Sequence, residues 1–321
     1  MANYTGGFNT ELNGDAVHTA IDKAMYETYS REGQPAYLSC SDSFFFKQGN
    51  TVGNAFIWDE QSNVGAFEKV NDQEDWNNTD VLVGNQKTKL SQKYFKQVPI
   101  SAEAFKADQI GLRAKIGEQV GDRARMTQDW EACLDTYADA FAGSVNTTPD
   151  GDALASNSHT TLTGANVDNL ETGALAPDAL WTDVTSLANQ KAQDGDPGSH
   201  IFEGLVVPFT LYKTAKEVLN SQLAPNSAEN NLNIFDTDYG QVQIKAPVYL
   251  GSAYNSATNA NTSYHLLSRN HMIQRKVFYG LNTDLVEPKY SSNDSWVLKV
   301  SYHETCFPGS WTGYLGSSGT T

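Results

Sequence analysis

Residues 93–111 read KYFKQVPISAEAFKADQIG, and within them the sequence changes from the pattern of a strand to the pattern of a helix. The helix that begins here is expected to be long: at 1.5 Å per residue, its roughly 40 residues would span on the order of 60 Å. A helix of this length is either part of a coiled coil or a spine laid across a sheet. The single apolar stripe and the three glycines within it favour the spine, and its length leaves room for a break near Asp108. The helix is expected from Ser101 to Phe141, with Gly143 just beyond its end. A mostly apolar stripe recurs every three or four positions along it, with one gap at Gln109: Phe105, Leu112, Ile116, Val120, Ala124, Thr127, Trp130, Leu134, Tyr137 and Phe141.

The segment before this helix predicts a first helix, short strands and one long excursion. An amphipathic helix is expected from Asp15, a plausible N-cap, to about Gly33. Between the second and third strands lies Gln61–Asp80, which is rich in Asn, Asp and Gln and too poor in apolar residues to form a core. Since an isolated two-stranded hairpin is only marginally stable in water, we expect this segment to form an extended arm that packs on another part of the protein or on another subunit. The three strands are expected at Phe44–Phe46, Phe56–Trp58 and Val81–Val83.

The segment after the long helix alternates loops, helices and strands. A polar loop at Asn146–Gly173 leads to a helix whose first turn holds Pro177. A buried strand at Gly204–Val207 then precedes a helix that Pro208 opens. The remaining strands are expected at Gln241–Leu250, Ser263–Leu267, Val277–Val286, Trp296–Glu304 and Trp311–Leu315.

The composition excludes several classes of protein. Lys and Arg number 22 against 38 Asp and Glu, for a net charge of -16, and a dedicated nucleic-acid binder needs clustered basic residues instead. Three scattered cysteines, Cys40, Cys133 and Cys306, have neither metal-ligand spacing nor the even number of a disulfide framework. We also expect no signal peptide, because the N-terminus has no basic region followed by an apolar stretch. No membrane span is expected, because no stretch approaches the roughly 18 apolar residues that a span needs.

The best candidate for chemistry is the loop DGDALASNSH at Asp150–His159. Its Asp150, Ser156, Ser158 and His159 are the residue types of a nucleophilic triad. However, nothing in this loop resembles a strained nucleophile elbow. A turn held by local side-chain hydrogen bonds is the favoured interpretation.

Metal and cofactor signals are equally weak. The acidic residues Asp236 and Asp238 with Gly240, and those within Asp72–Asp80, lack the alternating oxygen ligands and closing Glu of a calcium loop. No HExxH, Walker-type or GxGxxG motif occurs. We therefore predict no catalytic, cofactor-binding or metal-binding residues and no enzyme activity.

Three blocks of sequence resemble tailed-bacteriophage major capsid proteins with the Hong Kong 97-like fold, most of all the Mu-like major head subunits. The first is KYFKQVPISAEAFKADQIG at Lys93–Gly111, and the second is DGDALASNSH with Asn166 downstream. The third, FEGLVVPFTLYKTAKEVLNS at Phe202–Ser221, is followed by NNLNIF and QVQIKAPVYL. Together the blocks span roughly residues 90–250 in the order of that family.

The resemblance implies an α+β capsid fold with an N-terminal arm, an extended loop, a long spine helix, a peripheral domain and an axial domain. Residues 1–55 would form the N-terminal helix and arm, and residues 56–92 the extended loop. The peripheral domain with its spine helix would take residues 93–143 and 266–321, and the axial domain residues 144–265. Few residues precede the first strand, so we expect the mature subunit to keep its N-terminus and any scaffold to be a separate protein.

The implied function is that of a major head protein whose copies form hexamers and pentamers of an icosahedral shell around double-stranded DNA. Its expected partners are itself, portal, separate scaffold and cement proteins, and non-specifically contacted DNA, in a virion assembled in the bacterial cytoplasm. In the arm, the sizeable apolar residues Val70 and Trp76, with Val81, are predicted subunit contacts. Two alternatives stay open: an encapsulin-like nanocompartment shell, and an acidic β-rich binding or adhesion protein.

Overall fold

The chain forms two compact units. The first comprises Met1–Gly33, Ser91–Asp129 and Val277–Glu304, and the second Gln34–Leu90, Trp130–Lys276 and Thr305–Thr321. Among the described residues, no helix combines the length and hydropathy that crossing a bilayer requires. The structure is a computed structural model that describes residues 21–29, 38–39, 44–50, 53–62, 64, 81–101, 111–221, 233–287 and 295–319.

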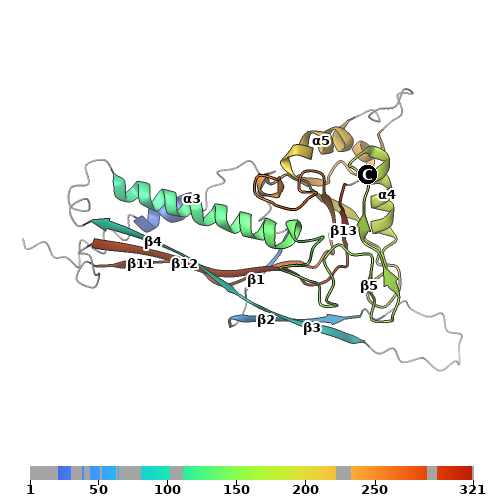
Figure 1. The fold of residues 1–321 in the computed structure, drawn as a ribbon, viewed down its shortest axis with the longest axis horizontal. Coiled ribbons are helices and arrows are strands. Elements are labelled where there is room, and N and C mark those ends of the chain that lie inside the picture. Colours follow the sequence, from blue (N-terminus) through green and yellow to red (C-terminus); the bar gives the residue numbers. More distant parts are fainter. Residues whose placement is uncertain are drawn as a thin grey trace, which may run out of the picture. The chain divides into compact units, whose positions relative to one another are not determined.

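The first unit is built on an antiparallel sheet (Figure 1). Its edge strand β4 (Gln92–Ser101) pairs with β12 (Ser295–Pro308), and β11 (Ile273–Val286) lies on the other side of β12. The short strand β1 (Lys47–Asn50) belongs to the second unit. Alternate residues of a strand point to the same face, and in β12 three of them enter one core: Trp296, Leu298 and Val300.

Two helices complete the core of this unit. The helix at residues 21–29 contributes Ile21 and Met25, and α3 (Leu112–Ala132) contributes Val120. The helices come very close because α3 has no side chain at Gly117, where a Cβ atom would lie 2.6 Å from the carbonyl oxygen of Ile21. Gly121 faces the backbone of Met25 in the same way. Two of the three glycines of the predicted spine, Gly117 and Gly121, are therefore helix-packing positions.

The predicted long helix is present but ends differently. α3 runs to Ala132, and a π-helical segment, η2, continues over Cys133–Ala138, so helical structure stops before Phe141. The reason is local, because the Asp139 carboxylate accepts hydrogen bonds of 2.7–2.8 Å from the backbone amides of residues 144–146 and turns the chain. Gly143 has a φ of 58°, but it lies in the turn five residues beyond Ala138, so its predicted place directly after the helix end was wrong. The expected helical residues 102–110 lie outside the described residues.

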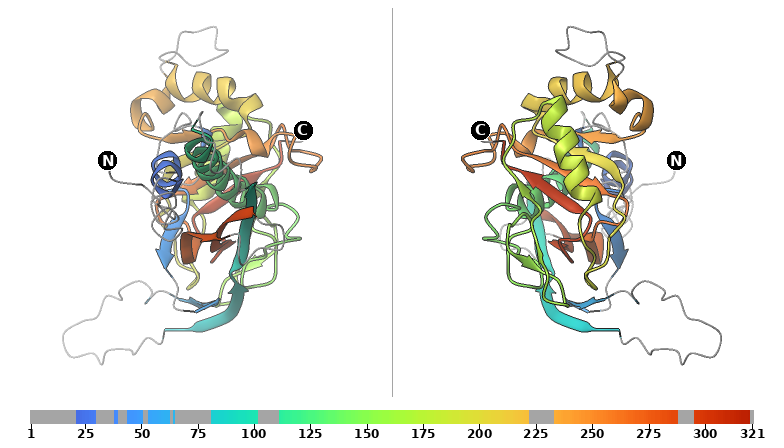
Figure 2. Two further views of the ribbon diagram at one scale, coloured as in Figure 1. Left: turned by 90° about the vertical axis from the view of Figure 1, so that its left-hand side faces the viewer. Right: turned by 90° about the vertical axis from the view of Figure 1, so that its right-hand side faces the viewer.

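A five-stranded mixed sheet forms the centre of the second unit (Figures 1 and 2). β10 pairs antiparallel with both of its neighbours, β13 and β8, and each of these pairs parallel with an outer strand. The order is β7 (Leu170–Glu171), β13 (Tyr314–Ser317), β10 (Tyr264–Ser268), β8 (Phe202–Val206) and β9 (Gln243–Lys245).

Both faces of this sheet are covered. One face packs on α4 (Pro177–Ala188) and on α5 (Tyr212–Asn220), with the short α6 (Ile234–Asp238) beside them. The other face joins a core that contains Phe45, Tyr137 and Tyr314. Pro177 opens α4 as predicted, and η3 (Phe209–Leu211) follows Pro208 ahead of α5.

Three predicted strands of the second unit were wrong in extent. Phe44–Phe46 form a turn, although Phe45 and Phe46 are completely buried, and the strand is the following β1. The strand predicted at Gln241–Leu250 is reduced to β9, because Pro247 has no amide hydrogen to continue a ladder and the short helix η4 (Val248–Leu250) follows. The last predicted strand begins only at Tyr314, after a turn in which Gly313 has a φ of 71°.

Candidate assembly surface and polar pocket

The hairpin of the second unit is formed by β2 (Ala55–Gln61) and β3 (Val83–Leu90). Its register pairs Ala55 with Leu90 and Gln61 with Val83. The second strand starts at Val83, at the end of the predicted Val81–Val83 strand. Because an isolated two-stranded sheet is marginal in water, contacts on its two faces decide whether it is ordered.

Two lysines of β3 attach the hairpin to the loop that follows η2. The Lys87 ammonium donates to the carbonyl oxygen of Thr147 and, at 2.9 Å, to its Oγ1. The Lys89 ammonium donates to Oδ1 of Asn146 at 2.5 Å. Asn146 is itself held, because its Nδ2 donates to the carbonyl oxygen of Asp135 at 2.7 Å. The loop therefore offers fixed acceptors to both lysines.

The strand β2 is attached by one aromatic side chain and one carboxyl. The ring of Phe56 lies 4.9 Å from that of Phe307, and the Lys276 ammonium lies 5.0 Å from the Phe56 ring centroid, a cation–π arrangement. Glu60 is only 3% exposed and accepts a 3.2 Å hydrogen bond from Nε2 of Gln193. These contacts hold the same face of the hairpin that carries Lys87 and Lys89.

Burial changes the ionisation of this attached face. Loss of solvent, assisted by the charge of Lys89, lowers the pKa of Lys87 to about 8. Loss of solvent and the Asp150 carboxylate raise the pKa of Glu60 to about 7. The hairpin is thus attached through two groups whose charges change near neutral pH.

The opposite face of the hairpin exposes apolar side chains. Ile57, Val83 and Leu90 are 56%, 68% and 60% exposed. Ile57 and Leu90 occupy positions that alternate with those of the attached residues. Val83 lies on the same face as Ile57 because the register shifts between Asp59 and Gln61 and pairs Val83 with Gln61. An exposed apolar surface on an ordered element is a typical protein-interaction site, and we call Ile57, Val83 and Leu90 the outer hairpin face.

Of the three predicted contact residues, the structure describes one. Val81 precedes β3 and is 49% exposed. Val70 and Trp76 lie outside the described residues. The sequence does not single out Ile57, because Ala55–Trp58 is apolar throughout and only the hairpin register assigns its residues to faces.

The Asp150–His159 loop is held by local hydrogen bonds. His159 is buried, with Nδ1 2.7 Å from the Asp150 carboxylate and Nε2 3.2 Å from the carbonyl oxygen of Leu154. Ser158 Oγ instead donates to Asp152 at 2.9 Å and contacts Ser156 Oγ. The histidine therefore faces an aspartate and a carbonyl, and the serines form a separate group, as the structural interpretation predicted.

Asp150, Asp152 and His159 place one potential metal-ligating atom each within 4.8 Å of one another. Burial opposes ionisation of Asp150, but hydrogen bonds from His159 and Thr148 outweigh it and hold the pKa of its carboxyl below the ordinary value. Each of the three side chains already has a hydrogen-bond partner in the loop. Asp236 and Asp238, the other acidic pair considered, lie exposed on α6.

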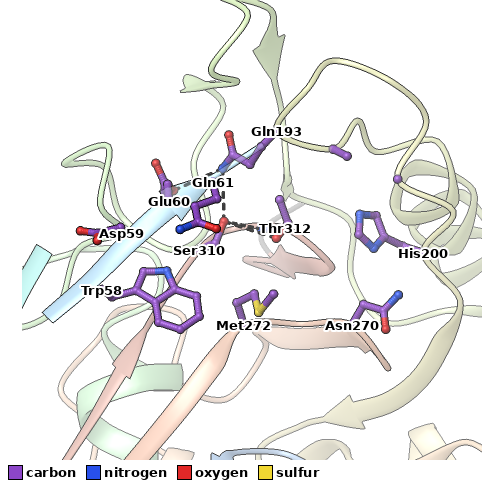
Figure 3. A pocket seen from close by; sticks show the side chains of 12 residues that line it. Trp58, Asp59, Glu60, Gln61, Gln193, His200, Asn270, Met272, Ser310 and Thr312 are labelled. Carbon is purple, nitrogen blue, oxygen red and sulfur yellow. Dashed lines mark hydrogen bonds between the residues drawn. The ribbon is translucent and has the colours of Figure 1, made fainter. Parts of the chain in front are cut away.

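A pocket of about 630 Å³ opens beside the attached side of β2 (Figure 3). Four segments of the second unit line it: residues 58–61, 192–200, 270–272 and 310–312. On one wall, Nε2 of Gln193 donates to Glu60 and, at 3.3 Å, to Oγ of Ser310. The ring of Trp58 and the thioether of Met272 line the opposite side (Figure 3). The pocket is therefore partly apolar, with carboxyl and amide groups along its wall.

Comparison with known proteins identifies one matching sequence family, described as phage capsid protein, which covers residues 87–312. No curated protein gives a significant match.

Solved structures with the same fold come from capsids and a virus-like particle. The capsid of an empty GTA particle aligns with a TM-score of 0.57 at 10% identity, covering 91% of this chain and 92% of that chain. The mature capsid of bacteriophage PhiM1 aligns with a TM-score of 0.51 at 13% identity over 84% and 83% of the two chains. The virus-like particle from Pyrococcus furiosus aligns with a TM-score of 0.51 at 10% identity over 93% and 98%. The predicted α+β capsid fold is confirmed, while its division into arm, extended loop, peripheral and axial domains stays a prediction.

Proposed function

Since this chain belongs to the phage capsid protein family, we propose that it is the major capsid subunit whose copies assemble into an icosahedral shell around phage double-stranded DNA. In this proposal it acts as a structural protein of the virion, without catalysis. Its copies meet in hexamers and pentamers, and portal, scaffold and cement proteins complete the particle during assembly in the host cytoplasm.

The outer hairpin face is the observation that carries the proposal. One face of β2 and β3 is attached to the second unit through Lys87, Lys89 and Phe56. The other presents Ile57, Val83 and Leu90 to solvent. A shell subunit requires such ordered surfaces, because each must bury apolar area against a neighbour without being needed for its own fold.

The arm that the hairpin leads into would add to this contact. By area bookkeeping, burial of Trp76 against a neighbour would contribute about 1.5–3 kcal/mol, and burial of Val70 and Val81 would add to it. Replacement of Asp72–Asp80 by a short Gly-Ser turn should leave the subunit folded and weaken assembly. If trimmed subunits formed particles of normal yield and heat resistance, the arm would not be this contact.

A shell that encloses protein cargo is the second candidate, favoured by the fold match to the virus-like particle from Pyrococcus furiosus. The two candidates differ in what the particle holds. A DNA-enclosing shell should protect nucleic acid from nuclease in particles isolated from the producing cells, whereas a nanocompartment should contain a second protein and no protected DNA.

The deciding experiment is purification of the full chain, followed by light scattering and negative-stain electron microscopy. We expect closed particles or capsomers, formed by the chain alone or with a scaffold protein. A chain that stays a stable monomer both alone and with a scaffold protein would contradict the proposal. It would favour the remaining alternative, an acidic binding or adhesion protein.

A further inference from the structure

The pocket of Figure 3 carries charge of one sign. Among the twelve residues that line it, the carboxylic side chains are Asp59 and Glu60, and none is Lys or Arg. Asp59 is exposed, and its Oδ1 accepts a 2.7 Å hydrogen bond from Gln86. His200 is buried in the wall, and loss of solvent lowers the pKa of its imidazole, so it adds no positive charge at neutral pH. The pocket is thus built to attract a cation.

Polar atoms of the wall also lack partners. Gln193 is 7% exposed, and its Oε1 has no hydrogen-bond partner among the described residues. The same is true, within the described part of the chain, of both ring nitrogens of His200, which is also 7% exposed. Buried polar groups are normally paired. An unpaired amide oxygen and an unpaired imidazole in the wall of one pocket therefore point to a ligand that supplies hydrogen bonds.

The apolar side of the pocket narrows the class of ligand. Trp58 is partly exposed, and Met272 is 37% exposed. An indole face attracts cations as well as apolar groups, and a thioether adapts to the shape of an aliphatic chain. A group with an aliphatic stem and a cationic, hydrogen-donating head matches both sides at once.

We propose that this pocket binds an alkyl guanidinium or alkyl ammonium group, with the stem against Trp58 and Met272 and the cationic head toward Glu60, while the Asp59 carboxylate adds negative charge at the rim. The group is either an arginine or lysine side chain of a neighbouring shell protein, or a free alkyl cation. Nothing in this assignment depends on shell formation, because one subunit supplies every lining residue.

Binding depends on pH through Glu60. That side chain faces Gln193, Asn85 of β3, and Asp150 and His159 of the loop, with Asp59 next to it in β2. Because burial raises its pKa to about 7, Glu60 is largely neutral at about pH 6 and ionised at about pH 8. A cation attracts the ionised form, so its affinity increases with pH and binding releases a proton.

The test is isothermal titration of the full-length subunit with butylguanidinium and with butylurea, its neutral counterpart of similar shape. We expect butylguanidinium to bind in the range up to about 20 mM, at least about fivefold more tightly than butylurea and more tightly at pH 8 than at pH 6. The Glu60→Gln, Asp59→Asn double variant should lose this preference. The matched control is Asp236→Asn, Asp238→Asn, two exposed carboxyls of α6.

The outcomes are distinct. Equal affinity for the two probes, no binding within that range, or full binding by the Glu60→Gln, Asp59→Asn chain would overturn the proposal. A second readout guards against a misfolded variant, because butylguanidinium should change tryptophan fluorescence in the native chain and not in Trp58→Phe. Titration of assembled particles distinguishes the two sources of the cation. If the particles no longer bind butylguanidinium, a side chain of a neighbouring protein occupies the pocket. If they still bind it, the ligand is a free cation.

Discussion

At Gly117 the absence of a side chain determines how two helices of the first unit pack. A Cβ atom there would lie 2.6 Å from the carbonyl oxygen of Ile21, closer than real Cβ contacts allow. Gly117→Ala improves helix propensity by about 1 kcal/mol, but overpacking costs about 1–3 kcal/mol. We expect a net loss of unfolding free energy of about 1 kcal/mol, measured by chemical denaturation. Gly280→Ala is the control, since a Cβ atom there meets nothing within 4 Å. A more stable Gly117→Ala chain would show that the helices separate at no cost.

Glu60 makes stability depend on pH in a direction opposite to that of most carboxyls. Its pKa is raised from 4.5 to about 7 in the folded chain, mainly by burial. Between these values the folded state binds more protons than the unfolded state. The stabilising contribution is therefore complete below pH 4.5 and is lost as pH rises through about 7.

Glu60→Gln keeps the shape of the side chain and removes the ionisation. We expect the variant to match the native chain near pH 4.5 and to melt at a higher temperature above about pH 7. Scanning calorimetry across this range provides the measurement, with the exposed Glu118→Gln as control. A pH-independent difference between Glu60→Gln and the native chain would contradict the assignment.

At the scale of elements, the outer hairpin face separates folding from assembly. Ile57 and Leu90 are more than half exposed, so Ile57→Ser with Leu90→Ser should change subunit stability by no more than about 0.5 kcal/mol per site. Assembly should weaken strongly, because both residues would be buried in every subunit contact. The measurement is particle yield by light scattering beside the melting temperature of the subunit. The control is Ile201→Ser, an exposed isoleucine of the same unit that lies outside the hairpin. Normal particle yield from the double variant would remove the hairpin from the interface.

At the scale of the whole molecule, charge opposes association. Each copy carries 38 acidic and 22 basic residues, a net charge of -16, so copies repel one another at low ionic strength. We expect self-association to strengthen between about 20 mM and about 300 mM salt, as the Debye length shortens. Light scattering at constant subunit concentration measures this. Weaker association at high salt would show that complementary charge pairs dominate the contact.

Much of the fold could be predicted because local patterns were long and regular. The apolar stripe along 112–132 predicted α3, and Pro177 marked the start of α4. The order of three sequence blocks predicted the capsid family, which a match over residues 87–312 then showed. These features depend on neighbours along the chain, so the sequence by itself determined them.

Tertiary structure decided the rest, because it depends on residues far apart in the chain. Phe45 looked like part of a strand and is a buried turn residue, and the apolar run Ala55–Trp58 was assigned to two faces only by pairing with β3. The pocket is the extreme case, since Glu60 and Gln193 are 133 positions apart. No local sequence pattern predicts a contact between residues so far apart in the chain, because the contact forms only when separate segments pack and bury these groups together.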